Sequence, residues 1–339
     1  MTTPAAFRFA SATNADRLVA GVPAAARLAR VLRGAQGDAP LVLVLPEGQA
    51  LAPRTLAEIG RLAPGIAVEI RASANGIVIP GEAMPDAEAL AAILAQAAPV
   101  PPAPADPRAA LDRAGRAILR RTSKPGDGIV SRRLNRPLSQ AVSAQLLRLG
   151  WVRPGHATVL TALAALAMLG CLLAFPSPAG LAAGAVLFQI ASVIDGVDGE
   201  IARATFRSSR SGASLDSLVD ALTNLAFLGG AGASFALQGE SAAATIAAGA
   251  CGVQAIGLAI LGSGAWRREG VLHFEGAKRA RLAQQQQRRT LLDDIVGRDF
   301  YCFAFMLAAL GGVLHIALGV FLAASLIWLA VVIRTALSH

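Results

Sequence analysis

The sequence predicts an α-helical integral membrane protein with six transmembrane helices, a preceding interfacial amphipathic helix and a small N-terminal α/β cytoplasmic domain. Of the 339 residues, 54% are hydrophobic and only 16% are charged, whereas a soluble protein carries about 25% charged residues. The apolar residues gather after residue 150, in runs long enough to cross a bilayer. Before that point, short apolar strands alternate with helical segments. These observations together predict two domains of different solubility.

The first hundred residues alternate in a way that is typical of an α/β domain. Strands are expected near Phe7, at "LVLVLP" (41–46) and at "IAVEI" (66–70), and helices over 23–34, 54–62 and 85–97. The start of the chain lacks a charged segment followed by an apolar run, so we expect this domain to stay in the cytoplasm. We place it at residues 1–97. A Pro/Ala-rich linker and connecting helix follow at 98–127, and the membrane domain occupies 128–339.

Three apolar regions account for the predicted spans. A membrane-spanning helix needs about 20 apolar residues. The regions 157–194 and 220–266 are each long enough for two helices, broken by "FPSPAG" and "QGES". The last region, 300–333, is either one overlong helix or a tight hairpin near "GGVLH", and we favour the hairpin. The total is six helices.

The basic residues indicate the orientation of these helices. They gather before the first span and in alternate connections, while the intervening turns contain none. The positive-inside rule then predicts a multi-pass protein of the cell inner membrane with both termini in the cytoplasm. The net charge of +9 is attributed to anionic membrane lipids rather than to nucleic acid.

The segment "NRPLSQAVSAQLLRLGW" (135–151) differs from the spans because its apolar residues lie on one stripe. Leu138, Val142, Leu146 and Leu149 form this stripe, with polar residues opposite. The pattern predicts an amphipathic helix on the membrane surface. A soluble helix packed on the first domain is the alternative.

Four aspartates lie within "DGVDGEIARATFRSSRSGASLDSLVD" (195–220), next to the second and third spans. Asp195 and Asp198 are spaced i, i+3, and Asp216 and Asp220 are spaced i, i+4, so each pair occupies one face of its helix. A short loop joins the two helices, so the pairs are expected to face each other. Converging carboxylates repel unless they are neutralised, and hard divalent cations suit such a set. Ionisable groups at membrane depth are functional by default.

This stretch resembles the signature of the CDP-alcohol phosphatidyltransferase family, D-x-x-D-G-x-x-A-R, eight residues, G-x-x-x-D-x-x-x-D. All the fixed positions and the spacing are present: Asp195, Asp198, Gly199, Ala202, Arg203, Gly212, Asp216 and Asp220. The likeness covers about residues 128–335 and includes the six-span pattern and the surface helix. The resemblance implies transfer of a phospho-alcohol group from a CDP-linked donor to an alcohol acceptor, with release of CMP, in phospholipid or phosphodiester biosynthesis.

The resemblance also implies roles for these residues. Asp195, Asp198 and Asp216 would hold two divalent ions, Mg²⁺ or Mn²⁺, and Asp220 would complete the site and act as general base. The CDP moiety would be lined by Asp195, Gly199, Ala202, Arg203, Gly212 and Asp216. Like other members, the protein is expected to form a homodimer through its membrane helices.

The upstream segment "KPGDGIVSRRLNRPLS" (124–139) resembles members that handle inositol phosphates, including di-myo-inositol phosphate phosphate synthases, some of which carry a fused cytidylyltransferase. "RLVAGVPAAARLARVLRGA" resembles a nucleotidyltransferase helix, but the glycine-rich loop of that enzyme class is missing. We therefore interpret the N-terminal domain as a degenerate relative; an unrelated α/β regulatory domain is the alternative.

Three arginines, Arg133, Arg136 and Arg298, are expected at the cytoplasmic mouth of the site, where they would bind the phosphate of an acceptor. Binding of lipid headgroups is the alternative, above all for Arg133. The donor is expected to be of the CDP-diacylglycerol or CDP-inositol type, and the acceptor stays open. A membrane transporter and a catalytically inactive membrane scaffold are the competing functions. The first is disfavoured because the acids cluster at one membrane face, and the second because every metal position is intact.

Overall fold

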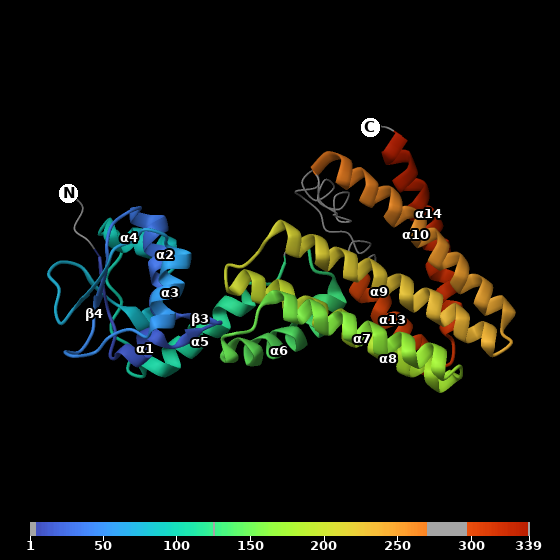
Figure 1. Ribbon diagram of the computed structural model, residues 1–339, viewed down its shortest axis with the longest axis horizontal. Coiled ribbons are helices and arrows are strands. Elements are labelled where there is room, and N and C mark those ends of the chain that lie inside the picture. Colours follow the sequence, from blue (N-terminus) through green and yellow to red (C-terminus); the bar gives the residue numbers. More distant parts are fainter. Residues whose placement is uncertain (1–4, 125, 270–296, 338–339) are drawn as a thin grey trace. The chain divides into compact units, whose positions relative to one another are not determined.

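The computed structural model describes residues 5–124, 126–269 and 297–337, and these form two compact units (Figure 1). Among the described residues, the first unit combines 5–122 with 143–152 and 203–206, and the second holds the others. The first is a small α/β unit and the second is helical, which confirms the predicted fold class. The division of the sequence at 97/98 and 127/128 stays a prediction.

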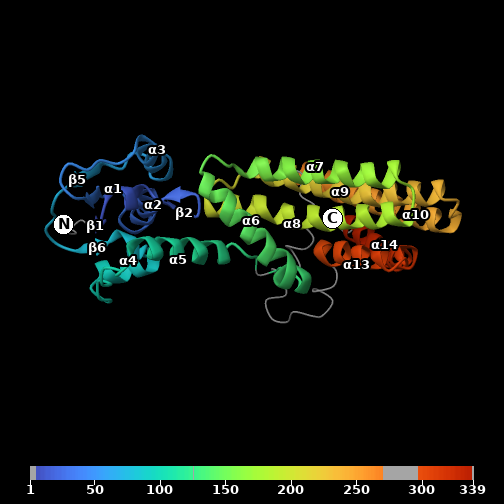
Figure 2. The ribbon, with the colours of Figure 1, turned by 90° about the horizontal axis from the view of Figure 1, so that it is seen from below.

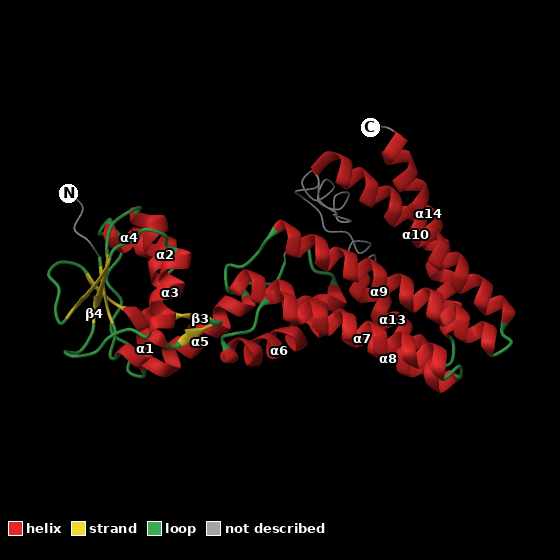
Figure 3. Ribbon diagram, in the orientation of Figure 1, coloured by secondary structure: helices red, strands yellow, loops and turns green. Residues whose placement is uncertain are grey.

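A four-stranded parallel sheet forms the centre of the first unit (Figure 3). Its strands are β5 (Val68–Arg71), β4 (Leu41–Val44), β1 (Ala6–Arg8) and β6 (Val78–Pro80), in that order. Phe7 on β1 pairs with Leu43 on β4 and with Ile79 on β6. All three side chains are fully buried, because helices cover a parallel sheet.

The helices of this unit, except for α1, lie at the predicted positions. They are α1 (Ala12–Asp16), α2 (Ala24–Gln36), α3 (Pro53–Leu62), α4 (Ala87–Leu94) and α5 (Pro107–Arg120), with a 3₁₀ turn, η1 (Gly81–Ala83), after β6 (Figure 2). The sequence did not predict β6, α1 or the short hairpin of β2 (Leu18–Val19) and β3 (Val22–Pro23). These elements have only two to five residues, too few for a periodic pattern to show.

The second unit contains five helices that are long and apolar enough to cross a membrane, among the residues that the structure describes. These are α7 (Pro154–Ala174), α8 (Pro178–Ala204), α9 (Arg210–Leu237), α10 (Ser241–Glu269) and α14 (Leu314–Leu337). α9 packs against α7 and α10, and α10 packs against α14. The protein is therefore a multi-pass membrane protein.

The last apolar region is a hairpin, as predicted. α13 (Arg298–Leu310) is joined to α14 by a turn at Gly311 and Gly312, and Gly312 has a φ of 72°. A left-handed residue of this kind favours glycine. α13 has 13 residues, which corresponds to about 20 Å. It is thus shorter than the roughly 30 Å of hydrocarbon, and α13, the fifth of the six predicted helices, is not among the candidate spans of the described residues.

An aromatic cluster packs the helices of the second unit together. Phe188 of α8 stacks on Phe227 of α9, with ring centroids 4.4 Å apart. Phe305 of α13 lies 5.5 Å from Phe227 and 5.2 Å from Phe321 of α14. Because Phe188, Phe227 and Phe305 are almost fully buried, this cluster fixes α8, α9 and α13 near the acidic segment.

The helix before the first span, α6 (Arg136–Leu149), follows a π-helical turn, η2 (Ser131–Asn135). Its polar residues Ser139 and Ser143 are buried, while Leu138, Val142 and Leu149 are exposed. A helix of a soluble domain shows the reverse pattern. The outward apolar stripe is typical of a helix at a membrane surface, while the second half of α6 belongs to the first unit, so the interfacial placement stays a prediction.

Candidate metal and substrate site

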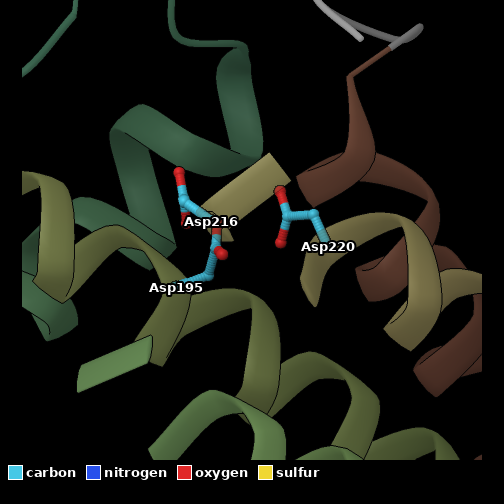
Figure 4. A group of neighbouring side chains, drawn as sticks. All are labelled: Asp195, Asp216 and Asp220. Carbon is cyan, nitrogen blue, oxygen red and sulfur yellow. The ribbon is translucent and has the colours of Figure 1, made fainter. Parts of the chain in front are cut away.

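Three carboxylates meet between α8 and α9 (Figure 4). Asp195 comes from α8, and Asp216 and Asp220 come from successive turns of α9. One carboxylate oxygen from each lies within 4.8 Å of the others. The sequence places Asp216 and Asp220 on one face of their helix, and the chain reversal after Ala204 brings Asp195 to that face. Three of the four predicted metal ligands therefore converge within 4.8 Å, and Asp198 lies next to them.

Asp198 is buried beside this group and has a protein partner of its own. Its Oδ2 atom accepts a hydrogen bond of 2.9 Å from Oγ1 of Thr158 on α7, and its residue is only 6% exposed. Its ligand role stays a prediction. Sequence reasoning missed Thr158, because a threonine in an apolar helix gives no signal by itself.

Arg298, the first residue of α13, reaches the carboxylates directly. Its Nη1 atom lies 3.2 Å from Oδ2 of Asp195 and also forms an ion pair with Asp220. Its Nε atom donates to Oδ1 of Asn224 at 3.0 Å. Its Nη2 atom is buried and has no hydrogen-bond partner among the described residues. The guanidinium group thus forms ion pairs with two acids, and its buried Nη2 atom can donate to a further acceptor.

Asn224 was also missed by sequence reasoning, although the sequence carries a signal for it. It lies one helical turn after Asp220, so that Asp216, Asp220 and Asn224 are spaced by four residues on one face of α9. An amide inside a span that continues an acidic stripe is a candidate member of the same site.

Arg136 forms hydrogen bonds with two carboxylates, and its predicted contact with an acceptor phosphate stays a prediction. Its Nε and Nη2 atoms donate to the two carboxylate oxygens of Asp127 at 2.8 and 3.1 Å, and its Nη1 atom donates to Glu200 at 3.1 Å. Glu200 is fully buried and also accepts from Ser139 at 2.6 Å. Burial favours the neutral acid of Asp127, but hydrogen bonds and the charge of Arg136 outweigh it and lower the pKa of that carboxyl group.

The other predicted residues occupy separate positions. Arg133 is exposed on η2, and Ala202 is half-buried on α8, which also carries Gly199. Arg203, in the last turn of α8, donates from Nε to the carbonyl of Thr122 at 2.9 Å. The N–H of Gly212 donates to Oγ of Ser209, the N-cap of α9, at 3.0 Å. Their part in CDP binding stays a prediction.

The donor set fits a divalent metal ion. Carboxylate oxygens are the ligands that Mg²⁺ and Mn²⁺ prefer in proteins. Three such oxygens within 4.8 Å of one another repel strongly at low dielectric constant, so they require positive charge. Arg298 pairs with two of these acids and supplies only one positive charge, so three ionised carboxylates need a further cation. The site therefore has the composition and the spacing of a metal centre.

The fold and the site together define a multi-pass membrane protein whose acidic residues converge from two neighbouring apolar helices. The chain belongs to the CDP-alcohol phosphatidyltransferase family, whose model matches residues 154–336. This match confirms the resemblance that the acidic signature indicated.

Three curated relatives bear the name bifunctional IPC transferase and DIPP synthase. The protein from Aquifex aeolicus is 46% identical over 103 residues, which are 30% of this chain and 22% of that protein. The protein from Thermococcus kodakarensis is 40% identical over 119 residues, 35% of this chain and 26% of the relative. The protein from Archaeoglobus fulgidus is 35% identical over 117 residues, which are 34% of this chain and 22% of that relative. The chain thus matches about a quarter of the length of these relatives.

Proposed function

We propose that this protein is a membrane enzyme that transfers a phospho-alcohol group from a CDP-linked donor to an alcohol acceptor and releases CMP. The convergence of Asp195, Asp216 and Asp220 within 4.8 Å, in a chain of this family, carries the proposal. The names of the relatives, which join a transferase and a synthase, support an acceptor or donor of the inositol phosphate type.

The metal would be Mg²⁺ or Mn²⁺, with two ions held by Asp195, Asp198, Asp216 and Asp220. When bound, the metal neutralises the diphosphate of the donor and stabilises the charge that develops on the departing CMP. Gly199, Ala202, Arg203 and Gly212 would line the cytidine and diphosphate, together with the first aspartate of each helix. The metal would also lower the cost of placing four acids beside apolar helices.

Asp220 would act as the general base. Its carboxylate removes the proton of the acceptor hydroxyl, and the oxygen forms a bond to the donor phosphorus that carries the alcohol. The anhydride bond breaks, and CMP leaves with the bridging oxygen. Arg298 forms an ion pair with Asp220, so a positive charge lies directly beside the carboxylate that would accept the proton.

Arg298 would also bind the phosphate of a phosphorylated acceptor. Its buried Nη2 donor has no partner among the described residues, and a buried donor without a partner costs about 1–3 kcal/mol. A substrate phosphate oxygen would satisfy this donor. Arg133 is exposed and would meet either such a substrate or the lipid headgroups, whereas the donors of Arg136 are directed at Asp127 and Glu200.

The test is release of CMP by the purified protein from CDP-diacylglycerol or CDP-inositol, with a panel of acceptors and Mg²⁺ or Mn²⁺. Asp216→Asn and Asp220→Asn should abolish CMP release, and removal of the metal by a chelator should do the same. Glu240→Gln, in the exposed turn before α10, is the control and should leave the rate unchanged. Retained activity in either aspartate variant would refute the site. Substrate movement into liposomes without CMP release would instead favour a transporter.

The N-terminal domain would lack cytidylyltransferase activity. In an open α/β sheet, ligands bind beyond the carboxyl ends of the strands, where the strand order reverses. Here β1 and β6 are neighbours at that point, and the buried carboxylate of Glu82 accepts hydrogen bonds from the N–H of Ala10 at 2.8 Å and from Asn14 at 3.0 Å. A carboxylate in this place repels the phosphates of a nucleotide. Formation of a CDP-alcohol from CTP by the full chain would contradict this.

The protein would lie in the inner membrane with both termini in the cytoplasm, as a homodimer. The dimer is supported by an open groove of about 490 Å³ on α9 and α10, which is lined by small residues such as Gly229, Gly232, Ala248 and Gly252. Small residues allow the close approach of membrane helices. A monomeric mass in nanodiscs would refute the dimer, and external labelling of a cysteine placed at either terminus would refute the orientation.

A further inference from the structure

A second polar cluster lies next to the carboxylate site. It includes residues one turn before Asp195 on α8 and directly after Arg298 on α13. We call it the Asn135 cluster; its members are Asn135 of η2, Gln189 and Ser192 of α8, and Asp299 of α13. Asn135, Gln189 and Ser192 are 3–5% exposed, and Asp299 is half-buried. Polar side chains at such positions cost free energy unless they are hydrogen-bonded.

The members of the cluster form hydrogen bonds with one another across three elements, and of their buried polar atoms only the amide oxygen of Gln189 lacks a partner among the described residues. The amide nitrogen of Asn135 donates to Oδ1 of Asp299 at 2.8 Å and to Oγ of Ser192 at 3.2 Å. The amide oxygen of Asn135 accepts from Gln189 at 2.7 Å. Ser192 in turn donates to the same oxygen of Asp299 at 2.9 Å. Asn135 therefore joins the start of α13 to α8.

The cluster is connected to the site at both ends. Ser192 precedes Asp195 by one turn of α8, and Asp299 directly follows Arg298 at the start of α13. The Nη1 atom of Arg298 lies 3.2 Å from Asp195, so a shift of α13 by about 1 Å would break this contact. The aromatic cluster packs α13 against α9, and the directional hydrogen bonds of the Asn135 cluster add a direct link between α13 and α8. Hydrogen bonds between buried groups define one position.

We propose that Asp299 and Asn135 are positioning residues that hold Arg298 at the carboxylate site in the orientation that binds the acceptor phosphate. They act through Arg298 and do not touch the reacting atoms. The inference rests on the proposed function, since it assigns the phosphate of the acceptor to Arg298. It depends on the oxygen of Asp299 as a hydrogen-bond acceptor and not on its charge.

The experiment compares two substitutions at Asp299. Asp299→Leu removes the acceptor of both hydrogen bonds, whereas Asp299→Asn retains an oxygen at the same place. With inositol phosphate or glycerol phosphate as the acceptor, whichever supports CMP release by the wild-type protein, Asp299→Leu should raise KM for the acceptor about 10-fold or more. KM for the CDP donor should change less than about 3-fold. Asp299→Asn should stay within about 3-fold of the wild type for both substrates.

The control is Gln254→Leu, which removes another hydrogen bond between membrane helices. Gln254 on α10 donates to Ser325 on α14 at 2.9 Å. If the effect of Asp299→Leu came from a general loss of packing, Gln254→Leu would raise KM in the same way. Under our proposal, Gln254→Leu leaves both KM values unchanged. If Asp299→Leu does not yield folded protein, Asn135→Leu and Ser192→Ala are measured in its place. Each should raise the KM for the acceptor more than the KM for the donor.

A double-substitution cycle separates positioning from a direct role. In an Arg298→Ala background, Asp299→Leu should raise the acceptor KM no further, because residues that act through one another are not additive. Additive effects, an equal rise of both KM values, or an unchanged acceptor KM would overturn the proposal, as would Asp299→Asn behaving like Asp299→Leu. CMP release with uncharged acceptors alone would overturn it as well. Absence of CMP release by the wild type is a different outcome, which rejects the proposed function itself.

Discussion

Replacing Arg136 with alanine would leave two buried acids without their shared cation. The side chains of Arg136, Asp127 and Glu200 are 11%, 9% and 0% exposed, respectively. All three nitrogens of the guanidinium group donate to these two carboxylates. After the substitution, Glu200 keeps the hydrogen bond from Ser139 and loses the one from Arg136, and Asp127 loses a bidentate partner.

The expected loss in the free energy of unfolding follows from this burial. Removing one partner of a buried ion pair costs about 3–5 kcal/mol, because the remaining charge stays desolvated. The matched control is Arg17→Ala. Arg17 also binds a carboxylate through two nitrogens, that of Asp112, but the two side chains are 37% and 45% exposed. An exposed pair contributes only about 0–1 kcal/mol. Arg136→Ala should therefore be the more destabilising change by several kcal/mol.

Denaturant titration in mild detergent micelles, followed by tryptophan fluorescence, would measure the difference. The same preparations would be assayed for CMP release, with KM determined for the donor and the acceptor. If Arg136→Ala unfolds at the same denaturant concentration as Arg17→Ala, and only the acceptor KM rises, the structural argument is refuted. Arg136 would then be the phosphate ligand that the sequence predicted.

Two further predictions concern neighbouring residues. Thr158→Val removes the donor to the buried Asp198, a bond to a charged group worth about 1.5–3 kcal/mol, so it should raise the Mg²⁺ concentration needed for half-maximal CMP release. Thr161→Val on the same helix loses only a hydrogen bond to the carbonyl of Ala157 and should leave the required Mg²⁺ concentration unchanged. Equal behaviour of the two variants would contradict the role of Thr158. Asp127 has a pKa that is lowered, against the effect of burial, by Arg136 and Lys124, so its ionised form stabilises the fold. This contribution is fully present at neutral pH. It is lost as the pH falls from about 4, the usual pKa of aspartate, to below the lowered pKa of Asp127 in the folded protein. Asp127→Asn should thus be less stable than the wild type at neutral pH and lose less stability on acidification; parallel curves of unfolding free energy against pH would reject this.

Much of the fold follows from local properties of the sequence. The length of an apolar run determines whether a helix can cross the hydrocarbon, so α7, α8, α9, α10 and α14 could all be expected. The pairing of acids on one helix face follows from the helical repeat, which explains why Asp216 and Asp220 were assigned together. The alternation of strands and helices in the first hundred residues likewise depends on neighbouring residues.

The sequence alone did not determine which side chains meet across helices. Arg136 and Arg298 are both basic residues near the ends of predicted spans, and only the structure assigns Arg298 to Asp195 and Asp220, and Arg136 to Asp127 and Glu200. Such contacts join residues that are far apart in the sequence, 78 positions in the case of Arg298 and Asp220. They depend on the rotation and the translation of one helix against another, which the packing of Phe188 on Phe227 sets together with other core contacts. The helical repeat defines the faces of a single helix, but the orientation of two helices relative to each other is decided by the packed core, which forms only in the folded chain.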